Sequence, residues 1–129
     1  MADLVTSGKI QGGTGGPFNV LLRSPVLGEA VVRYGEYVRS KTPLPAKLNE
    51  LAVLITTRYW TGQSPWYAHH RAATQAGLNE AIIGAIAEGR RPSSMQPDEE
   101  AVYNFCSELL KSGEVSDATF RAAKDRLGG

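Results

Sequence analysis

Cysteine is almost absent from this chain of 129 residues, which contains only Cys106. A single cysteine excludes an internal disulfide and any cysteine-based metal cluster within one chain. It also suits a reducing compartment, so we expect a cytoplasmic location. The two histidines are direct neighbours, and neither a His-x-x-x-His nor a Glu-x-x-His spacing occurs. The sequence therefore predicts no metal site and no cofactor.

Long apolar runs and clusters of one charge are missing as well. No apolar segment approaches the roughly 20 residues that span a bilayer, and no basic region followed by an apolar one marks a secretory signal. The 14 basic and 13 acidic residues are spread along the chain, so we expect neither a nucleic-acid-binding surface nor a membrane partner. Length and composition suit one soluble domain covering residues 1–129.

Glycine is concentrated near the N-terminus, where residues 12–17 read Gly-Gly-Thr-Gly-Gly-Pro. This density argues against a helix, so residues 1–23 are predicted to form an extended entry segment. No Gly-Lys-Ser/Thr closes the stretch, and a structural loop is therefore favoured over a phosphate-binding one.

Helical periodicity dominates the rest of the chain, with no alternating strand pattern and no internal repeat. Between about residues 46 and 60, apolar residues recur at spacings of three and four, as on the core-facing side of a helix. Residues 80–88 are apolar nearly all round, which indicates burial inside the domain or against a second subunit. We predict an all-α fold of about six helices, at residues 25–40, 46–60, 65–76, 80–88, 98–111 and 117–127. The predicted N-cap residues are Ser24, Ser64, Asn79 and Ser116.

The most informative stretch is residues 64–77, which places His69 and His70 side by side on one helix. Histidine titrates near neutrality and is therefore the first candidate for proton transfer. Neighbouring side chains project at about 100° to each other, so we expect one imidazole to be buried and the other solvated. Trp66, His69 and Ala73 share a face. That face is either a core stripe with an inserted imidazole or a pocket, floored by Trp66, in which His69 meets a small substrate.

Two further side chains on the helix at 46–60 are candidates for chemistry. Glu50 is either partly buried and paired or exposed at the edge of the apolar stripe. If this helix and the histidine helix form an antiparallel hairpin, Glu50 and His69 approach each other and form an acid/base pair. Arg58 is either a clamp for a substrate carboxylate or a partner of the helix dipole. Cys106, in contrast, is predicted to be a buried and unreactive residue.

Three motifs together resemble the carboxymuconolactone decarboxylase and alkylhydroperoxidase-D family. They are Leu-Pro-Ala-Lys-Leu-Asn-Glu-Leu-Ala-Val-Leu at 44–54, Trp-Tyr-Ala-His at 66–69 and Ala-Gly-Leu at 76–78. Residues 16–25 also resemble the family's entry segment, so the match covers most of residues 16–90. The resemblance implies an all-helical fold and assembly as a homo-oligomer, a trimer or a hexamer.

The two branches of that family differ in the residues before the histidine. The peroxidase branch carries Cys-x-x-Cys-x-x-x-His, and anchoring on His69 places its cysteines at Gly62 and Pro65. Without a sulfur nucleophile and a resolving partner, disulfide-linked peroxide reduction is not expected. The decarboxylase branch favours Glu-Trp-x-x-His, of which Trp66 and His69 are retained while Pro65 replaces the glutamate. The upstream glutamate of the peroxidase branch corresponds to Glu50.

The resemblance thus implies a cofactor-free lyase similar to carboxymuconolactone decarboxylase, acting on a small carboxylated lactone or a related intermediate of aromatic catabolism. In this interpretation His69 is the general acid/base, Glu50 is its partner and Trp66 is a pocket wall. Arg58 is the candidate for holding a substrate carboxylate. The alternative is a non-catalytic oligomeric scaffold, or small-ligand binder, of the same fold.

Overall fold

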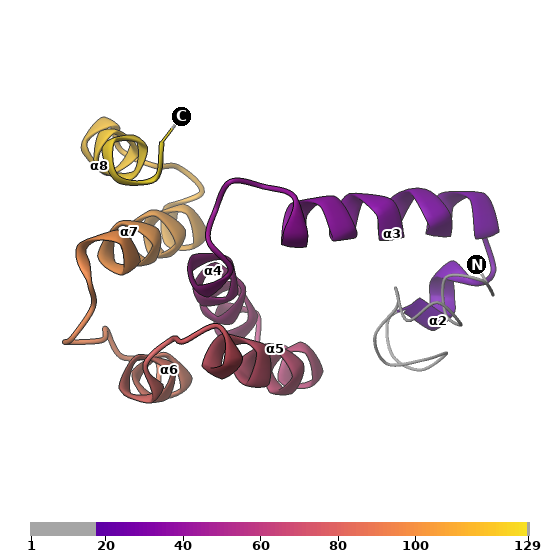
Figure 1. Ribbon diagram of the computed structural model, residues 1–129, viewed down its shortest axis with the longest axis horizontal. Helices are drawn as coiled ribbons and strands as arrows, with labels where there is room; N and C mark the ends of the chain where they lie inside the picture. The colour runs from indigo at the N-terminus through magenta and orange to yellow at the C-terminus, as the bar shows by residue number, and fades with distance from the viewer. Residues whose placement is uncertain (1–17, 129) are drawn as a thin grey trace. The chain divides into compact units, whose positions relative to one another are not determined.

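The structure is a computed structural model that describes residues 18–128, and within this range it contains helices and no strand (Figure 1). The predicted all-α class is therefore confirmed. The glycine-rich residues 12–17 lie outside the described residues. The seven described helices are α2 (Phe18–Leu21), α3 (Pro25–Ser40), α4 (Ala46–Tyr59), α5 (Gln63–Gln75), α6 (Glu80–Ala87), α7 (Pro97–Ser112) and α8 (Asp117–Leu127).

The extended entry segment predicted for residues 1–23 is wrong for its last part, because Phe18–Leu21 forms the short helix α2. The glycines end at residue 16, and the residues that follow lack the backbone freedom on which the extended prediction depended. Turn hydrogen bonds continue the coiling, with the amide of Arg23 donating to the carbonyl of Val20 at 3.2 Å. The chain therefore enters α3 through a tight turn.

The N-caps of the later helices follow the sequence, with one correction. Asn79 accepts a hydrogen bond from the Ala81 amide at 2.8 Å, and Ser116 accepts one from the Thr119 amide at 3.3 Å. Ser24 occupies the N-cap of α3, but its side chain makes no capping hydrogen bond. Ser64, predicted as an N-cap, instead lies inside the first turn of α5. The N-cap is Gly62, whose carbonyl accepts a hydrogen bond from the Trp66 amide at 3.0 Å. The helix therefore starts two residues earlier than predicted from Ser64 as the N-cap.

The chain divides into two compact units at the junction between Pro43 and Leu44. The described part of the first unit consists of α2 and α3, and α3 leaves many large apolar side chains exposed. These are Val26, Leu27, Val31, Tyr34, Tyr37 and Val38. The second unit contains α4 to α8, and every site discussed below lies within it.

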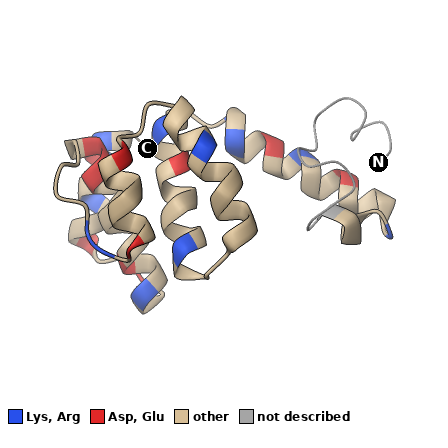
Figure 2. Cartoon of the chain, turned by 90° about the horizontal axis from the view of Figure 1, so that it is seen from below, with Lys and Arg blue, Asp and Glu red and all other residues tan. Residues whose placement is uncertain are grey.

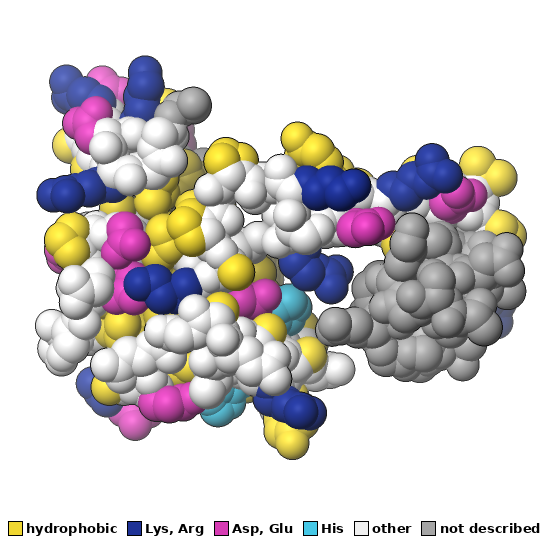
Figure 3. Space-filling view, viewed as in Figure 1, with side chains coloured by type: hydrophobic (Ala, Val, Ile, Leu, Met, Phe, Trp, Pro, Cys, Tyr) yellow, Lys and Arg dark blue, Asp and Glu magenta, His cyan; other side chains and the backbone are white. Residues whose placement is uncertain are grey.

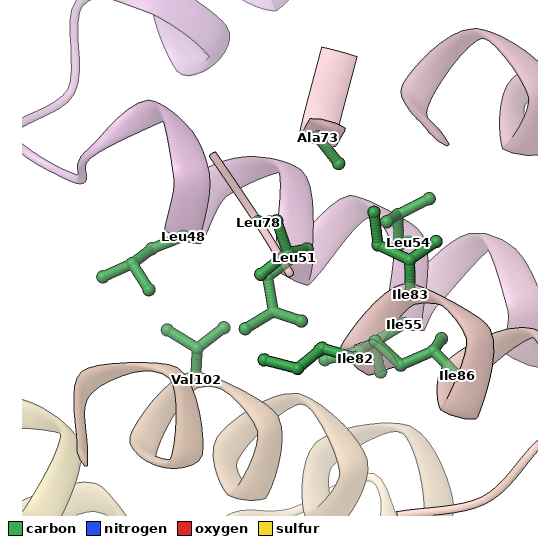
Figure 4. Close-up of a cluster of buried hydrophobic side chains, with 10 residues drawn as sticks. All are labelled: Leu48, Leu51, Leu54, Ile55, Ala73, Leu78, Ile82, Ile83, Ile86 and Val102. Atoms are coloured by element: carbon green, nitrogen blue, oxygen red, sulfur yellow. The ribbon is translucent and has the colours of Figure 1, made fainter. Parts of the chain in front are cut away.

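A cluster of ten buried side chains forms the core of the second unit (Figure 4). The helix α4 contributes four of them and packs against α5, α6 and α7, while α7 packs against α8. Each fully buried leucine or isoleucine contributes about 1.5–3 kcal/mol through removal of apolar surface from water. The members are Leu48, Leu51, Leu54, Ile55, Ala73, Leu78, Ile82, Ile83, Ile86 and Val102.

The apolar helix α6 is buried by its own chain. Its three isoleucines, Ile82, Ile83 and Ile86, are at most 4% exposed, whereas Ala81, Gly84 and Ala87 form the exposed side. Of the two alternatives predicted for residues 80–88, burial inside the domain therefore accounts for the large side chains. The solvent-facing side of α6 carries only small residues and the two flanking glutamates.

Charged residues of both signs are spread over the helices (Figure 2). One pair has a buried carboxylate: Lys47 Nζ at the start of α4 lies 2.8 Å from Glu99 Oε1 in α7, and Glu99 is only 4% exposed. The hydrogen bond to Glu99 raises the pKa of Lys47. Glu99 also accepts the amide of Gln96 at 2.8 Å, which closes a capping box at the N-terminus of α7. Within residues 18–128, no helix is both long and apolar enough to cross a membrane.

Candidate active site

The site is built on a tight helical hairpin formed by α4 and α5. Only Trp60, Thr61 and Gly62 connect the two helices, and the Gly62 amide donates to the Thr57 carbonyl at 2.9 Å. Thr61 adopts a left-handed backbone conformation, with φ of 55°, which reverses the chain within this short connection. The turn brings α5 back along α4, and the two helices pack closely, which is the condition under which Glu50 and His69 were expected to approach each other.

The hairpin places a carboxylate against an imidazole. Glu50 Oε2 lies 2.7 Å from Nδ1 of His69, although the two residues are 19 positions apart in the chain. Glu50 is only 8% exposed, whereas the His69 side chain keeps 26% of its surface accessible. The predicted approach of Glu50 to His69 is thus present, with the carboxylate inside and the imidazole reaching solvent. Both histidines reach the surface of the molecule (cyan in Figure 3).

This geometry fixes which nitrogen of His69 is available for chemistry. An ionised carboxylate can only accept hydrogen bonds, so the neutral imidazole carries its proton on Nδ1 and donates it to Glu50. The lone pair then lies on Nε2, to which no hydrogen bond is seen from the described residues. The arrangement can take a proton at Nε2 and return it, while the carboxylate orients the ring and stabilises the imidazolium.

His70 has a different environment. Its Nε2 lies 3.2 Å from Glu80 Oε2 at the start of α6, and its side chain is 41% exposed. The expectation of one buried and one solvated imidazole is therefore wrong in part, because neither ring is fully buried. Both rings lie at the edges of α5, where each meets a glutamate of a neighbouring helix rather than the apolar core.

Trp66 and Arg58 line a pocket of about 350 Å³ at the turn end of the hairpin. The Arg58 Nε donates to the carbonyl of Ala87 at 2.8 Å, so this guanidinium binds the C-terminal end of α6. Neither His69 nor Glu50 is among the residues that line this pocket. The ring of Trp66 lies 6.4 Å from that of His70, one turn further along α5. Of the two alternatives for this face, the core stripe accounts for Ala73, which is fully buried, and for Trp66, which packs against the core. Trp66 also lines a pocket, but not one that contains the imidazole of His69.

The four predicted site residues form two pairs rather than one cluster. Arg58 follows Glu50 by eight residues, which is about 12 Å along the axis of α4 at 1.5 Å per residue. Trp66 precedes His69 by three residues, or about 4.5 Å along α5.

Sequence reasoning missed part of the pocket wall. Thr57, Tyr67 and Ala87 also line it, and the Ala87 carbonyl holds the arginine. Thr57 was detectable, because it lies on the same face of α4 as Glu50. The contribution of Ala87 was not, since it depends on how α6 packs against α4.

No group of three metal-ligating side chains is present among the described residues. Burial raises the pKa of the Cys106 thiol to about 11, which agrees with its prediction as an unreactive residue. Comparison of the chain with protein-family models, with curated proteins and with solved structures finds no match in any of the three.

Proposed function

We propose that the chain is a cofactor-free lyase similar to carboxymuconolactone decarboxylase, which acts on a small carboxylated lactone or a related intermediate of aromatic catabolism. The observation that carries the proposal is the 2.7 Å contact between Glu50 Oε2 and His69 Nδ1. It supports acid/base chemistry because the carboxylate partner is buried while the His69 side chain keeps 26% of its surface accessible.

The proposed reaction needs one proton at one carbon atom. Loss of carbon dioxide breaks the bond between the carboxylate carbon and the ring, and the electron pair passes into the conjugated lactone. His69, protonated at Nε2, delivers a proton to the resulting carbanion-like centre, and Glu50 stabilises the imidazolium before transfer. Trp66 contacts the substrate ring, and Arg58 holds an anionic group remote from the reacting carbon.

Two further parts of the proposal come from the sequence. Assembly as a trimer or a hexamer follows from the family resemblance, and a cytoplasmic location follows from the single cysteine.

The neighbouring histidines provide a matched experiment. Carbon dioxide release from a panel of carboxylated lactones is measured for the wild-type chain and for the variants His69→Gln, Glu50→Gln and His70→Gln. We expect His69→Gln to lower the rate by about 10²–10⁴-fold, since a positioned general acid/base contributes that much. His70→Gln should retain the wild-type rate. Equal rates for the two histidine variants, or no release by the wild-type chain on the whole panel, would refute the proposal.

A second candidate is a non-catalytic small-ligand binder. The observation that favours it is the separation of the Trp66–Arg58 pocket from the imidazole of His69. A binder predicts that the same lactones bind without turnover, that Trp66→Ala abolishes binding and that His69→Gln leaves it unchanged.

A further inference from the structure

A second pocket, of about 280 Å³, lies between α4, the connection after α6 and the C-terminal half of α7. Three cationic side chains line it: Arg58 from α4, Arg90 from the connection and Lys111 from the last turn of α7. None of the described residues that line this pocket is an aspartate or a glutamate. The acid/base pair is elsewhere on the hairpin, so this pocket has no part in the proposed proton transfer, and Arg58 is the one residue that it shares with the proposed substrate contacts.

The positive charge of this pocket is only partly neutralised by the protein. Arg90 is paired with the carboxylate of Glu88, to which its Nε donates at 2.6 Å. Arg58 donates a hydrogen bond from its Nε to the neutral carbonyl of Ala87. Its Nη2 lies near Gly89, at the edge of the pocket. Among the described residues, neither Arg58 nor Lys111 has a carboxylate within ion-pair distance. Two cationic groups therefore face one small cavity without an acidic partner.

Acidic groups on the surrounding elements are already engaged. In α7, Glu100 binds Arg91, and the Arg91 guanidinium in turn lies 5.1 Å from the centre of the Tyr103 ring. Glu108 accepts the backbone amide of Ser116 at 2.9 Å, on the side of α8. The uncompensated charge thus remains available to a ligand.

The rest of the wall limits the kind of anion. Ile55 and Ile86, both less than 10% exposed, form an apolar floor together with Leu110. Tyr103 and Ser107 add hydroxyl groups beside this floor. The volume lies just below the roughly 300–1,000 Å³ of small-molecule sites. A single ring that carries one acidic group fits both the floor and the cationic rim, whereas a bare inorganic ion would leave the floor uncovered.

We propose that this pocket binds a small ring-bearing acid, whose carboxylate or phosphate is held by Arg58, Arg90 and Lys111 while its ring covers Ile55 and Ile86. The site is distinct from the Glu50–His69 pair, and its existence does not require the chain to be a lyase. Charge-assisted hydrogen bonds supply the recognition of the acidic group, and apolar contact supplies that of the ring.

The test is a titration of the full chain with benzoate, phenyl phosphate and the neutral benzamide, followed by calorimetry and by NMR shifts. We expect at least one of the two anions to bind, with affinity falling as salt rises, and benzamide to bind at least 10-fold more weakly. Shift changes should centre on Tyr103 and Lys111. Which of the two anions binds more tightly identifies the acidic group.

Two variants distinguish binding of the anion in this pocket from a general attraction of anions to the positive charges of the protein. Lys111→Gln, at an exposed position, should weaken anion binding about 10-fold, as loss of one charged hydrogen bond predicts. Arg71→Gln removes an exposed arginine of α5 outside the pocket and should leave the affinity unchanged. Binding of neither anion, equal affinity of benzamide, or equal effects of the two variants would overturn the proposal. His69→Gln should not alter binding, which keeps this result independent of the lyase assay.

Discussion

Glu80 shows what one exposed carboxylate does between two helices. Its Oε1 accepts the hydroxyl of Thr74 at 2.5 Å, and its Oε2 lies 3.2 Å from His70, so the end of α5 is joined to the start of α6. The hydrogen bond from Thr74, followed by the contact with His70, lowers the pKa of Glu80 below its usual value of 4.5. A negative charge in the first turn of α6 is also favourable for the helix dipole.

The lowered pKa gives a prediction of pH dependence. Because the folded-state pKa lies below the unfolded value, the ionised Glu80 stabilises the fold above pH 4.5 and loses this effect as pH falls through the folded-state pKa. Glu80→Gln should therefore lower the melting temperature at pH 7, and its difference from the wild-type chain should vanish under acid conditions. Thermal unfolding by circular dichroism at several pH values measures this. Glu114→Gln, on an exposed carboxylate, is the control. A difference that stays constant or grows as the pH falls through the whole acid range would contradict the prediction.

The partner of a side chain could be predicted from the sequence where it lies on the next helix along the chain. An approach of Glu50 to His69 was expected if the two helices formed an antiparallel hairpin, and in the structure the two side chains are in contact. The partner of Arg58 was not predictable. Its guanidinium binds a backbone carbonyl at Ala87, and a carbonyl exists at every residue, so no side-chain pattern identifies the one that is used.

At the scale of helices, two glycines have opposite roles. Gly113 ends α7 in the left-handed region, with φ of 75°, whereas Gly84 lies inside α6 and no atom lies within 4 Å of the position that a β-carbon would take. Gly113 adopts a backbone conformation that residues with a side chain disfavour. Gly84 needs no such conformation, and its only effect is to add conformational entropy to the unfolded chain.

Alanine at these two positions should therefore change stability in opposite directions. We expect Gly84→Ala to raise the free energy of unfolding by about 0.5–1 kcal/mol and Gly113→Ala to lower it by about 1 kcal/mol. Urea denaturation measures both. The same sign of change for the two variants would show that the local conformation does not control their effects.

The boundaries of helices were predictable to the extent that their caps are local. Asn79 and Ser116 cap their own helices and are visible in the sequence. The start of α5 was placed incorrectly because Gly62 is held by the Thr57 carbonyl across the hairpin turn, a contact between two elements. Proline at 65 was an ambiguous signal, since any position of the first turn tolerates it.

For the molecule as a whole, the two units contribute unequally to stability. All ten residues of the core cluster belong to the unit that begins at Leu44. The described helices of the other unit, α2 and α3, contribute none of them. Isolated helices of this length are marginal in water, because nucleation is unfavourable and packing supplies most of the stability.

A fragment of residues 44–129 should therefore fold without the residues before it. We expect one cooperative urea transition and a helical spectrum from this fragment, and a largely unfolded spectrum from a peptide of residues 18–43. Circular dichroism of both gives the answer. A non-cooperative transition of residues 44–129 would show that the first unit is needed for the core.

The periodicity of apolar residues was enough to predict the all-α class and the core, but not the pockets. Leu48, Leu51, Leu54 and Ile55 recur at helical spacing and are buried as that spacing predicts. The three cations of the second pocket come from positions 58, 90 and 111, and only the packing of α4 against α7 brings them to one cavity.

Cys106 is half-buried in α7, so the rate at which its thiol reacts can measure local opening of the fold. With a pKa of about 11, about one thiol in 10⁴ is ionised at pH 7 while the fold is closed. An alkylating reagent therefore modifies the native protein slowly, and modification accelerates each time the packing around α7 opens and the thiol meets water. Since this is the only cysteine, the rate of adduct formation by mass spectrometry reports that opening directly, without an introduced label.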